Sequence, residues 1–328
     1  MKRDEIGYRL RRHSGAYSAA VMFVLVFAIY IINHQVGWTV AVITTAANKG
    51  VLLAIVAMAQ TLPVLTSGID LSVGMVFVLA NCVASHLVVG TPLQAALGCM
   101  AVLAIGALCG LVNGLIVVYG RLQPIITTLA TGTIYYGISL GLRPVPGGEV
   151  QTELADALTG APLLGIPSLV LVLAAVVLCI WVPYRRSAIG RAAFAIGSAE
   201  SAAYMSGVPI GRAKIVTYTL AGLLAAVGGL LLTFVTYSGE ASAAIGGTYT
   251  LNSIAAVVIG GTSLAGGAGS AIGSIFGAFV LRTIGDLLFV FDLEPLWQPL
   301  FQGLILLVAV SLGALQLLKI GNRLELFR

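Results

Sequence analysis

Residues 93–119 read LQAALGCMAVLAIGALCGLVNGLIVVY, a stretch without a single charged side chain. A bilayer core offers no hydrogen-bond partners, so a spanning segment must satisfy its backbone as a helix or within a closed barrel. A helix needs about 20 apolar residues to cross about 30 Å of hydrocarbon, whereas barrel strands are shorter and alternate in polarity. The stretch therefore predicts a membrane-spanning helix.

The rest of the chain has the same character. Of 328 residues, 59% are hydrophobic and 9% are charged, and the mean hydropathy is +1.04, whereas a soluble domain is about a quarter charged. The sequence thus predicts an all-α membrane protein with about ten transmembrane helices. These spans lie near 17–36, 46–66, 72–90, 93–119, 125–142, 166–184, 213–235, 250–264, 270–290 and 296–318.

The basic residues predict the orientation of these spans. Cytoplasmic loops of membrane proteins are enriched in Lys and Arg, and placing both termini inside puts fourteen of the seventeen Lys and Arg residues there, if Lys214 at the edge of its helix is included. The net charge of +5 then reflects topology, and we expect no nucleic-acid partner. The cytoplasmic segments are 1–16, 67–71, 121–123, 185–212, 265–269 and 319–328.

The acidic residues fall mainly on the opposite, outer side, at Glu149, Glu153, Asp156, Glu240, Asp286, Asp292 and Glu294. The first span follows the basic segment MKRDEIGYRLRRH without a clean cleavage site, so we expect it to be retained rather than removed as a signal peptide. The longest cytoplasmic segment, 185–212, is too short to fold alone. Residues 1–328 are therefore expected to form a single transmembrane domain.

Motifs for chemistry are missing from the sequence. It contains no GxxxxGK[ST] phosphate loop, no HExxH and no GxSxG, and His13, His34 and His86 are scattered. The four cysteines lie in apolar runs without CxxC spacing, which suggests neither a disulfide framework nor a metal cluster. We expect no catalytic residue, no metal site and no cofactor in this chain.

A few polar residues interrupt the spans, and each is a functional candidate because burying it in a membrane is costly. The alternative is that they form hydrogen bonds between helices, as Asn and Gln commonly do. Both interpretations stay open at this point. The residues are Lys49, Gln60, Asp70, Asn81, Asn113, Asn252 and Arg282.

The segment SGIDLSVG (67–74) carries the most informative carboxylate, Asp70. It could cap the following helix by accepting the amides of Leu71 to Val73, or it could contact a substrate or an ion. Just upstream, Pro63 is expected to kink or break its span.

The segment GGTSLAGG (260–267) can be laid over 67–74, and each segment follows an apolar span. Corresponding interrupted helices in two halves are typical of transporter repeats. In a chain with 40 glycines the match could also arise by chance.

The stretch GRAAFAIGSAESAAYMSGVPIGRAK (190–214) is basic at both ends and lies on the expected cytoplasmic side. Its centre, 198–206, predicts two turns of helix capped by Ser198 and stopped by Gly207, with Pro209 beyond. Such a helix on the membrane face could dock a soluble partner. An ordinary positive loop is the alternative.

Four phrases carry a resemblance to a known family over most of the chain, from about residue 52 to 312. They are TSGIDLSVG (66–74), NGLIVVYGRLQPIITTLATGTIYYGISL (113–140), GRAAFAIGSAESAAYMSGVPIGRAKIVTY (190–218) and YTLNSIAAVVIGGTSLAGGAGSAIGSIFGA (249–278). The chain resembles the permease subunits of bacterial ATP-binding-cassette importers for monosaccharides, which are related to branched-chain amino-acid permeases. It departs from the family's glycine-rich approach to GIDLSVG, since AQTLPVLT precedes the motif here.

The resemblance implies a multi-pass protein of the bacterial plasma (inner) membrane that works in a larger assembly. A second permease subunit would pair with it, ATPase subunits would bind ATP and magnesium on the cytoplasmic side, and a periplasmic or extracellular binding protein would deliver sugar. Membrane lipid would surround the spans. The segment that the resemblance identifies as the ATPase-coupling helix comprises Ala199, Glu200, Ser201, Ala202, Ala203, Tyr204, Met205, Ser206 and Gly207.

Three functions remain to be compared. A sugar permease would contact neutral hydroxyls, an importer of amino acids or another solute would use the same machinery, and a secondary transporter or channel would work without ATP. An anionic solute would need basic residues in the pathway, where only Lys49 and Arg282 are available. Substrate-pathway candidates are Gln60, Asn81, Asn113, Thr127, Thr128, Tyr135 and Asn252; structural or gating candidates are Pro63, Gly68, Asp70 and Gly74.

Overall fold

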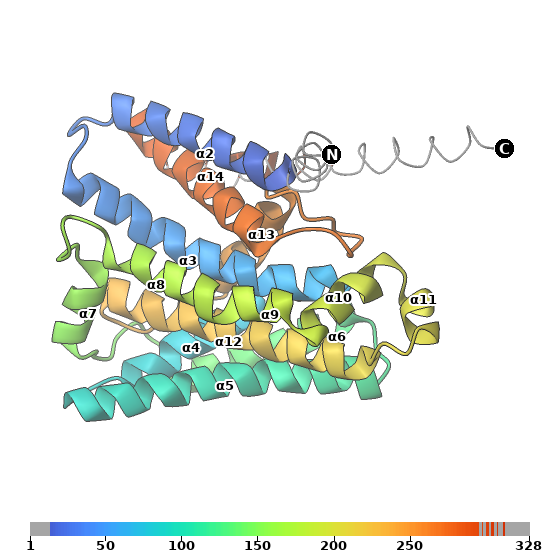
Figure 1. Ribbon diagram of the computed structural model, residues 1–328. Coiled ribbons are helices and arrows are strands. Elements are labelled where there is room, and N and C mark those ends of the chain that lie inside the picture. The colour runs from blue at the N-terminus through green and yellow to red at the C-terminus, as the bar shows by residue number, and fades with distance from the viewer. Residues whose placement is uncertain are drawn as a thin grey trace.

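The computed structural model describes residues 14–294, together with positions 297, 300, 301, 303, 304, 307 and 311. Within residues 14–294 the regular elements are helices, arranged as an elongated bundle (Figure 1). The expected tenth span, 296–318, lies outside the described residues apart from those single positions, and so do the expected cytoplasmic ends, 1–13 and 319–328. The elements are α2 (Ser14–Asn33), α3 (Val40–Leu65), α4 (Val73–Leu87), α5 (Pro92–Tyr119), α6 (Pro124–Leu142), α7 (Thr152–Thr159), α8 (Ser168–Val176), η1 (Val177–Trp181), α9 (Val182–Arg186), α10 (Ala188–Ser198), α11 (Glu200–Met205), α12 (Ile210–Thr236), α13 (Ala243–Ile259) and α14 (Ala271–Val290).

Seven of the described helical segments are long and apolar enough to cross a membrane. They are α2, α3, α5, α6, the continuous segment Ser168–Arg186, α12 and α14, while α4 and α13 are shorter apolar helices. The prediction of an all-α membrane protein is therefore confirmed.

Two predicted boundaries were wrong, and helix capping explains both. The span expected at 250–264 is α13, which begins at Ala243 because the side chain of Ser242 accepts the Ile245 amide. The span expected at 46–66 begins at Val40, where the side chain of Thr39 accepts the Val42 amide. A capping side chain replaces a partner that the first helical turn lacks, and neither Ser nor Thr lowers the local hydropathy much.

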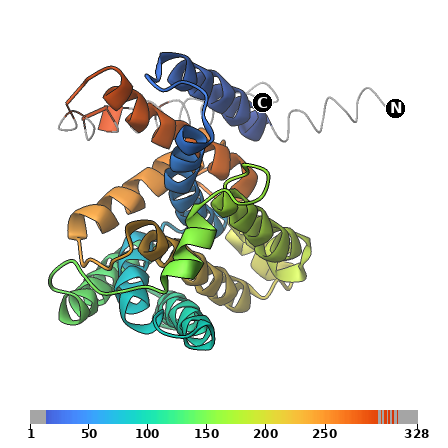
Figure 2. The ribbon, with the colours of Figure 1, turned by 90° about the vertical axis from the view of Figure 1, so that its left-hand side faces the viewer.

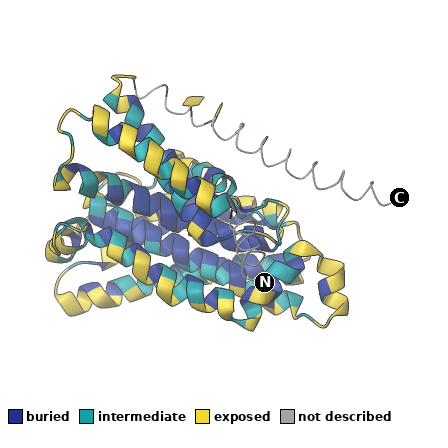
Figure 3. Ribbon diagram, turned by 45° about the horizontal axis from the view of Figure 1, so that its top comes forward, coloured by how far each residue is buried: buried dark blue, intermediate teal, exposed yellow. Residues whose placement is uncertain are grey.

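Helices α3 and α12 form the centre of the bundle. Helix α12 packs against α3, α4 and α5, and α3 also packs against α13 and α14. Every residue from Gly50 to Leu65 is buried, so this part of α3 is covered on all sides (Figure 3). A helix that is apolar all round belongs in the interior, and here it brings Gln60 and Thr61 inside with it.

Glycines allow α5 and α12 to touch along their backbones. A Cβ added at Gly110 would lie 2.1 Å from the carbonyl oxygen of Tyr218, and one added at Gly222 would lie 2.2 Å from that of Gly106. Small residues at four-residue spacing permit this close approach between membrane helices. The α5–α12 contact holds the first half of the chain to the second.

Two interruptions separate neighbouring helices at the same end of the bundle. The first interruption, residues 66–72, joins α3 to α4, and the second interruption, residues 260–270, joins α13 to α14. Both lie at the end that carries α10 and α11 (Figure 1), while α7 lies at the opposite end, which faces the viewer in Figure 2. With the orientation predicted above, the shared end is cytoplasmic.

Of the kink or break expected at Pro63, the break does not occur. Helix α3 continues through Pro63 to Leu65, and the carbonyl of Pro63 accepts the amides of Thr66 and Gly68. Proline has no backbone N–H, so it removes one helical hydrogen bond, and its ring crowds the preceding turn. Here these effects do not end the helix. The chain leaves the helix two residues later, where Ser67 adopts a left-handed conformation with φ of 60°.

Candidate functional site

The carboxylate of Asp70 is buried at the start of α4, with 2% of the residue exposed. Its Oδ1 accepts the backbone amide of Ser72 at 2.8 Å and the Ser72 hydroxyl at 2.6 Å. The Leu71 amide donates instead to Thr128 Oγ1, at 2.8 Å. Of the three residues expected to donate their amides to Asp70, from Leu71 to Val73, only Ser72 does so. The carboxylate therefore stabilises the turn of the first interruption through Ser72 alone.

The side chain of Gln60, on α3, binds the backbone of Asp70. With its amide oriented to satisfy both partners, Gln60 donates to the Asp70 carbonyl at 2.8 Å and accepts the Asp70 amide at 3.2 Å. Gln60 is completely buried. Buried polar groups in proteins are almost always hydrogen-bonded. The Gln60 side chain supplies partners for the backbone amide and carbonyl of Asp70, which lies outside any helix and so has no helical hydrogen bonds.

Two further helices join this buried polar network. Asn113 of α5 donates to Ser72 Oγ at 2.8 Å. The hydroxyl of Tyr135, on α6, lies 3.2 Å from Asn113 Oδ1 and 3.0 Å from the Cys109 carbonyl. The network thus links α3, the first interruption, α5 and α6, and Ser72 connects Asp70 to Asn113. Sequence reasoning missed Ser72, although a serine directly before an apolar helix is a recognised start signal.

Two hydroxyls beside the network have no partner within the described residues. They are Thr127 Oγ1 on α6 and the Tyr218 hydroxyl on α12. Gly68 makes room for Tyr218, because a Cβ added there would lie 2.5 Å from its hydroxyl oxygen. Tyr218 was also missed by sequence reasoning, since no local pattern marks which side of α12 faces the interruption.

Gly74, the remaining structural candidate, lies at the start of α4 and contacts α13. Its amide donates to Thr250 Oγ1 at 3.1 Å, and an added Cβ would lie 1.9 Å from the Gly246 carbonyl oxygen. Asn252 lies further along α13 and is half-buried. The structure therefore does not bring Asn252 into the buried polar network.

Asn81 lies apart from the network, toward the outer end. It donates to Thr233 Oγ1 at 2.8 Å and to the Ser238 carbonyl at 3.0 Å, and it accepts the Glu240 amide at 2.9 Å. Nearby, Tyr237 donates a short hydrogen bond to Asp156 of α7. That bond raises the pKa of Tyr237, because ionisation would lose it and place two negative charges together.

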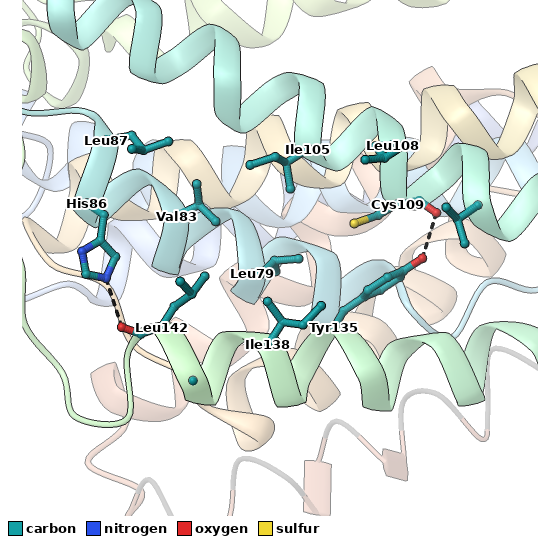
Figure 4. Close-up of a pocket in the computed structure, with 12 residues that line it drawn as sticks. Leu79, Val83, His86, Leu87, Ile105, Leu108, Cys109, Tyr135, Ile138 and Leu142 are labelled. Carbon is teal, nitrogen blue, oxygen red and sulfur yellow. Dashed lines mark hydrogen bonds between the residues drawn. The ribbon is translucent and has the colours of Figure 1, made fainter.

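A cavity of about 580 Å³ lies between α4, α5 and α6. It extends from Tyr135 to His86, with mostly aliphatic side chains between them (Figure 4). His86 Nε2 lies 3.0 Å from the Leu142 carbonyl. Such a lining offers few partners for a polar solute, so the cavity is a poor candidate for a sugar site and contacts the polar network only at Tyr135.

The two basic candidates within the spans share one carboxylate. Lys49 Nζ and Arg282 Nη2 each lie 3.2 Å from Asp286 Oδ1. This cluster joins α3 to α14, and Asp286 itself is buried. Charges inside a membrane protein commonly pair in this way, so Lys49 and Arg282 are both engaged within the bundle.

The segment expected to dock a partner forms a short helix, α11, at the end of the bundle that holds both interruptions. Glu200 at its start forms an ion pair of 2.7 Å with Lys214 of α12, and Ala203 packs against Ile196 and Ala213. Tyr204 and Met205 are 73% and 80% exposed. The inner side is therefore anchored while two large apolar side chains project outward.

The predicted cap of α11 was wrong. Ser198 is the last residue of α10, where its hydroxyl donates to the Phe194 carbonyl. Ala199 occupies the cap position without a side-chain bond. At the other end Gly207 has φ of +74° and its amide donates to the Tyr204 carbonyl, which is a common helix termination.

Together these features define a multi-pass membrane protein of the transporter class, with apolar spans, a buried polar network and helix interruptions at one end. The family model described as branched-chain amino acid transport system / permease component matches residues 42–310. The chain belongs to this family of permease components.

Relatives in the family are named as sugar permeases. The chain is 38% identical to a ribose import permease protein of Escherichia coli (strain K12) over 78% of its own length and 80% of the relative's. It is 35% identical to that of Bacillus subtilis (strain 168), covering 89% and 90%. A fructose import permease protein of Rhizobium meliloti is 33% identical, covering 82% and 76%. No solved structure matches.

Proposed function

We propose that this chain is the transmembrane permease subunit of an ATP-binding-cassette importer that carries a neutral monosaccharide across the bacterial plasma membrane. The observation that carries this is the position of α11, which projects Tyr204 and Met205 from the end that holds both interruptions. Such a surface suits a soluble partner acting on the permease. The names of the ribose and fructose permeases support sugar as the cargo.

ATP and magnesium would be held by separate ATPase subunits on the cytoplasmic side. Residues 199–207 would insert into a groove of that subunit, with the Glu200–Lys214 ion pair fixing the angle of α11. A second permease copy would complete the pathway, and an outer binding protein would deliver the sugar. Alternating access then requires two arrangements of the helices with similar free energies, and no reactive group.

The charges within the spans favour an uncharged cargo. An anionic solute would need cations in its pathway, but Lys49 and Arg282 both lie against Asp286 at the contact between α3 and α14, where the carboxylate offsets one of the two positive charges. Sugar hydroxyls instead need weak, uncharged partners. Two of the pathway candidates could bind a hydroxyl in this conformation. The Thr127 hydroxyl lacks a partner within the described residues, and Asn252 is half-buried.

Reconstitution tests the proposed function. Proteoliposomes would contain the full-length chain with its cognate ATPase and binding protein, and uptake of labelled ribose, fructose, galactose and leucine would be measured with and without ATP. We expect ATP-dependent uptake of one of the sugars. Uptake at full rate without ATP would instead indicate a secondary transporter, and uptake of leucine alone would indicate an amino-acid importer.

A further inference from the structure

Three segments far apart in the sequence meet at the cytoplasmic end of the bundle. They are the end of α3 and start of the first interruption (65–67), the end of α10 (197–198) and the middle of the second interruption (265–267); we call their contact the glycine junction. The Gly267 amide donates to the Leu65 carbonyl at 3.1 Å. Ser67 Oγ lies 2.7 Å from the Ala265 carbonyl and 3.4 Å from that of Gly197.

The glycine junction is packed backbone against backbone. A Cβ added at Gly197 would lie 2.1 Å from the Leu65 carbonyl oxygen and 2.3 Å from the Gly267 nitrogen. One added at Gly267 would lie 2.5 Å from the Ser198 hydroxyl oxygen and 2.6 Å from the Ser198 nitrogen. The side chains at these contacts are the short ones of Ser67 and Ser198, so little of a displacement of one segment is absorbed before it reaches the others.

One of the three segments leads directly to α11. Gly197 and Ser198 end α10, and only Ala199 separates them from Glu200, the first residue of α11. Ala203 of α11 also packs back onto Ile196. Helices α10 and α11 are thus joined through Ala199 and through the packing of Ala203 on Ile196. Because of these two connections, a force on the exposed face of α11 reaches the glycine junction within a few residues.

The other two segments lead to the helices that begin at the interruptions. Ser67 lies three residues before Asp70, whose carboxylate binds Ser72 at the start of α4. Gly267 lies three residues before Ser270, which caps α14. A displacement at the glycine junction therefore acts on the starts of α4 and α14 at the same time.

On this basis, and resting on the proposed function, we propose that the glycine junction is the element that transmits movement of α11 to both interruptions. Ser67, Gly197 and Gly267 are positioning residues in this proposal: they contact neither ATP nor sugar but set how far the helices move for each movement of α11. The competing view is that the junction merely fastens the cytoplasmic end. The two views differ in what happens to transport when the protein remains folded and bound to its ATPase.

The test measures sugar uptake per ATP hydrolysed in the reconstituted importer described above. Gly197→Ala forces the three segments apart, and Gly247→Ala is the matched control, because a Cβ at Gly247 meets nothing within 4 Å. We expect Gly197→Ala to copurify with the ATPase and to lower uptake per ATP about tenfold, within the usual range of couplings between sites. Gly247→Ala should keep the wild-type ratio.

Ser67→Ala keeps the proposal falsifiable if Gly197→Ala fails to fold. It removes the hydroxyl that contacts Ala265 and Gly197 without adding an atom, and we expect a twofold to fivefold lower ratio with an unchanged melting temperature. A wild-type ratio in folded, ATPase-bound variants would overturn the glycine junction proposal alone. Absence of ATP-dependent uptake in the wild-type complex would overturn the proposed function instead.

Discussion

The two interruptions occupy equivalent places between helices but are built differently. The first is closed by side chains: Asp70 and Ser72 are buried, and Gln60 serves the backbone between the helices. The second is closed mainly by its own backbone, with left-handed glycines at 261, 266 and 267 and a bond from the Ser263 amide to the Ala268 carbonyl; its one internal side-chain bond runs from the Ser270 amide to the Thr262 hydroxyl. Similar sequence patterns thus lead to one mostly buried connection and one that is partly exposed.

Because of this difference, we expect the two interruptions to be sensitive to different kinds of substitution. The first should be sensitive to changes in hydrogen-bonding groups, because unpaired buried polar atoms are costly. The second should be sensitive to added volume, because its glycines sit against backbone. Both share the end of the bundle that carries α11, and each is followed by a helix that begins after a serine, Ser72 or Ser270.

The largest effect is expected from a change at the shared end. Glu200→Arg would replace the ion pair with Lys214 by repulsion and change the surface proposed to dock the ATPase. We expect uptake to fall at least tenfold in proteoliposomes, with insertion and melting temperature unchanged, since an exposed ion pair stabilises a fold by less than about 1 kcal/mol. Gly207→Trp, at the other end of α11, should act in the same way, and unchanged transport in either variant would count against docking through this helix.

Removing the carboxylate of the first interruption should give the largest loss of stability. Asp70→Ala leaves the Ser72 amide and hydroxyl without their acceptor, which we expect to cost about 3 kcal/mol of unfolding free energy. Reversible unfolding in mixed micelles would measure it. Asp70→Asn, which retains the size and one acceptor oxygen, should lose clearly less; equal losses would mean that the stabilisation comes from the negative charge of the carboxylate rather than from its acceptor oxygen.

The second interruption should respond to volume. A Cβ at Gly260 would lie 2.3 Å from the Gly273 carbonyl carbon, so Gly260→Ala should separate α13 from α14 and cost about 2 kcal/mol. The same micelle measurement applies, with Gly247→Ala on α13 as the control. If both variants unfold like the wild type, the backbone contact at Gly260 is not limiting and the contrast between the interruptions weakens.

The smallest effect is expected where a single hydroxyl is lost without a change of shape. Thr128→Val keeps the volume but removes the acceptor of the Leu71 amide and the donor to the Pro124 carbonyl of its own helix. We expect a loss of about 1 kcal/mol, and faster hydrogen exchange of the Leu71 amide by mass spectrometry on peptides covering 66–74. Thr133→Val, on the exposed side of α6, is the matched control and should leave exchange in this peptide unchanged.

The sequence by itself determined the class of the protein and most of its spans. The physical reason is local: a bilayer requires about 20 consecutive apolar residues for each crossing, and this signal needs no knowledge of neighbours. It also marked Gly207 as a helix stop and Asp70 as an unusual carboxylate. It failed at Thr39, Ser242 and Ser198, because the choice of a cap depends on a backbone turn that hydropathy does not record.

Only the tertiary structure decided how the marked residues relate to one another. Gln60 binds the Asp70 backbone, Asn113 binds Ser72 and Tyr135 binds Asn113, so three different helices join one network, whereas Asn81 and Asn252 lie elsewhere. Lys49 and Arg282 prove to share Asp286, and Gly197 meets the second interruption across some seventy residues of sequence. Such contacts depend on how helices pack, and packing is set by complementary shapes brought together from distant segments rather than by any local pattern.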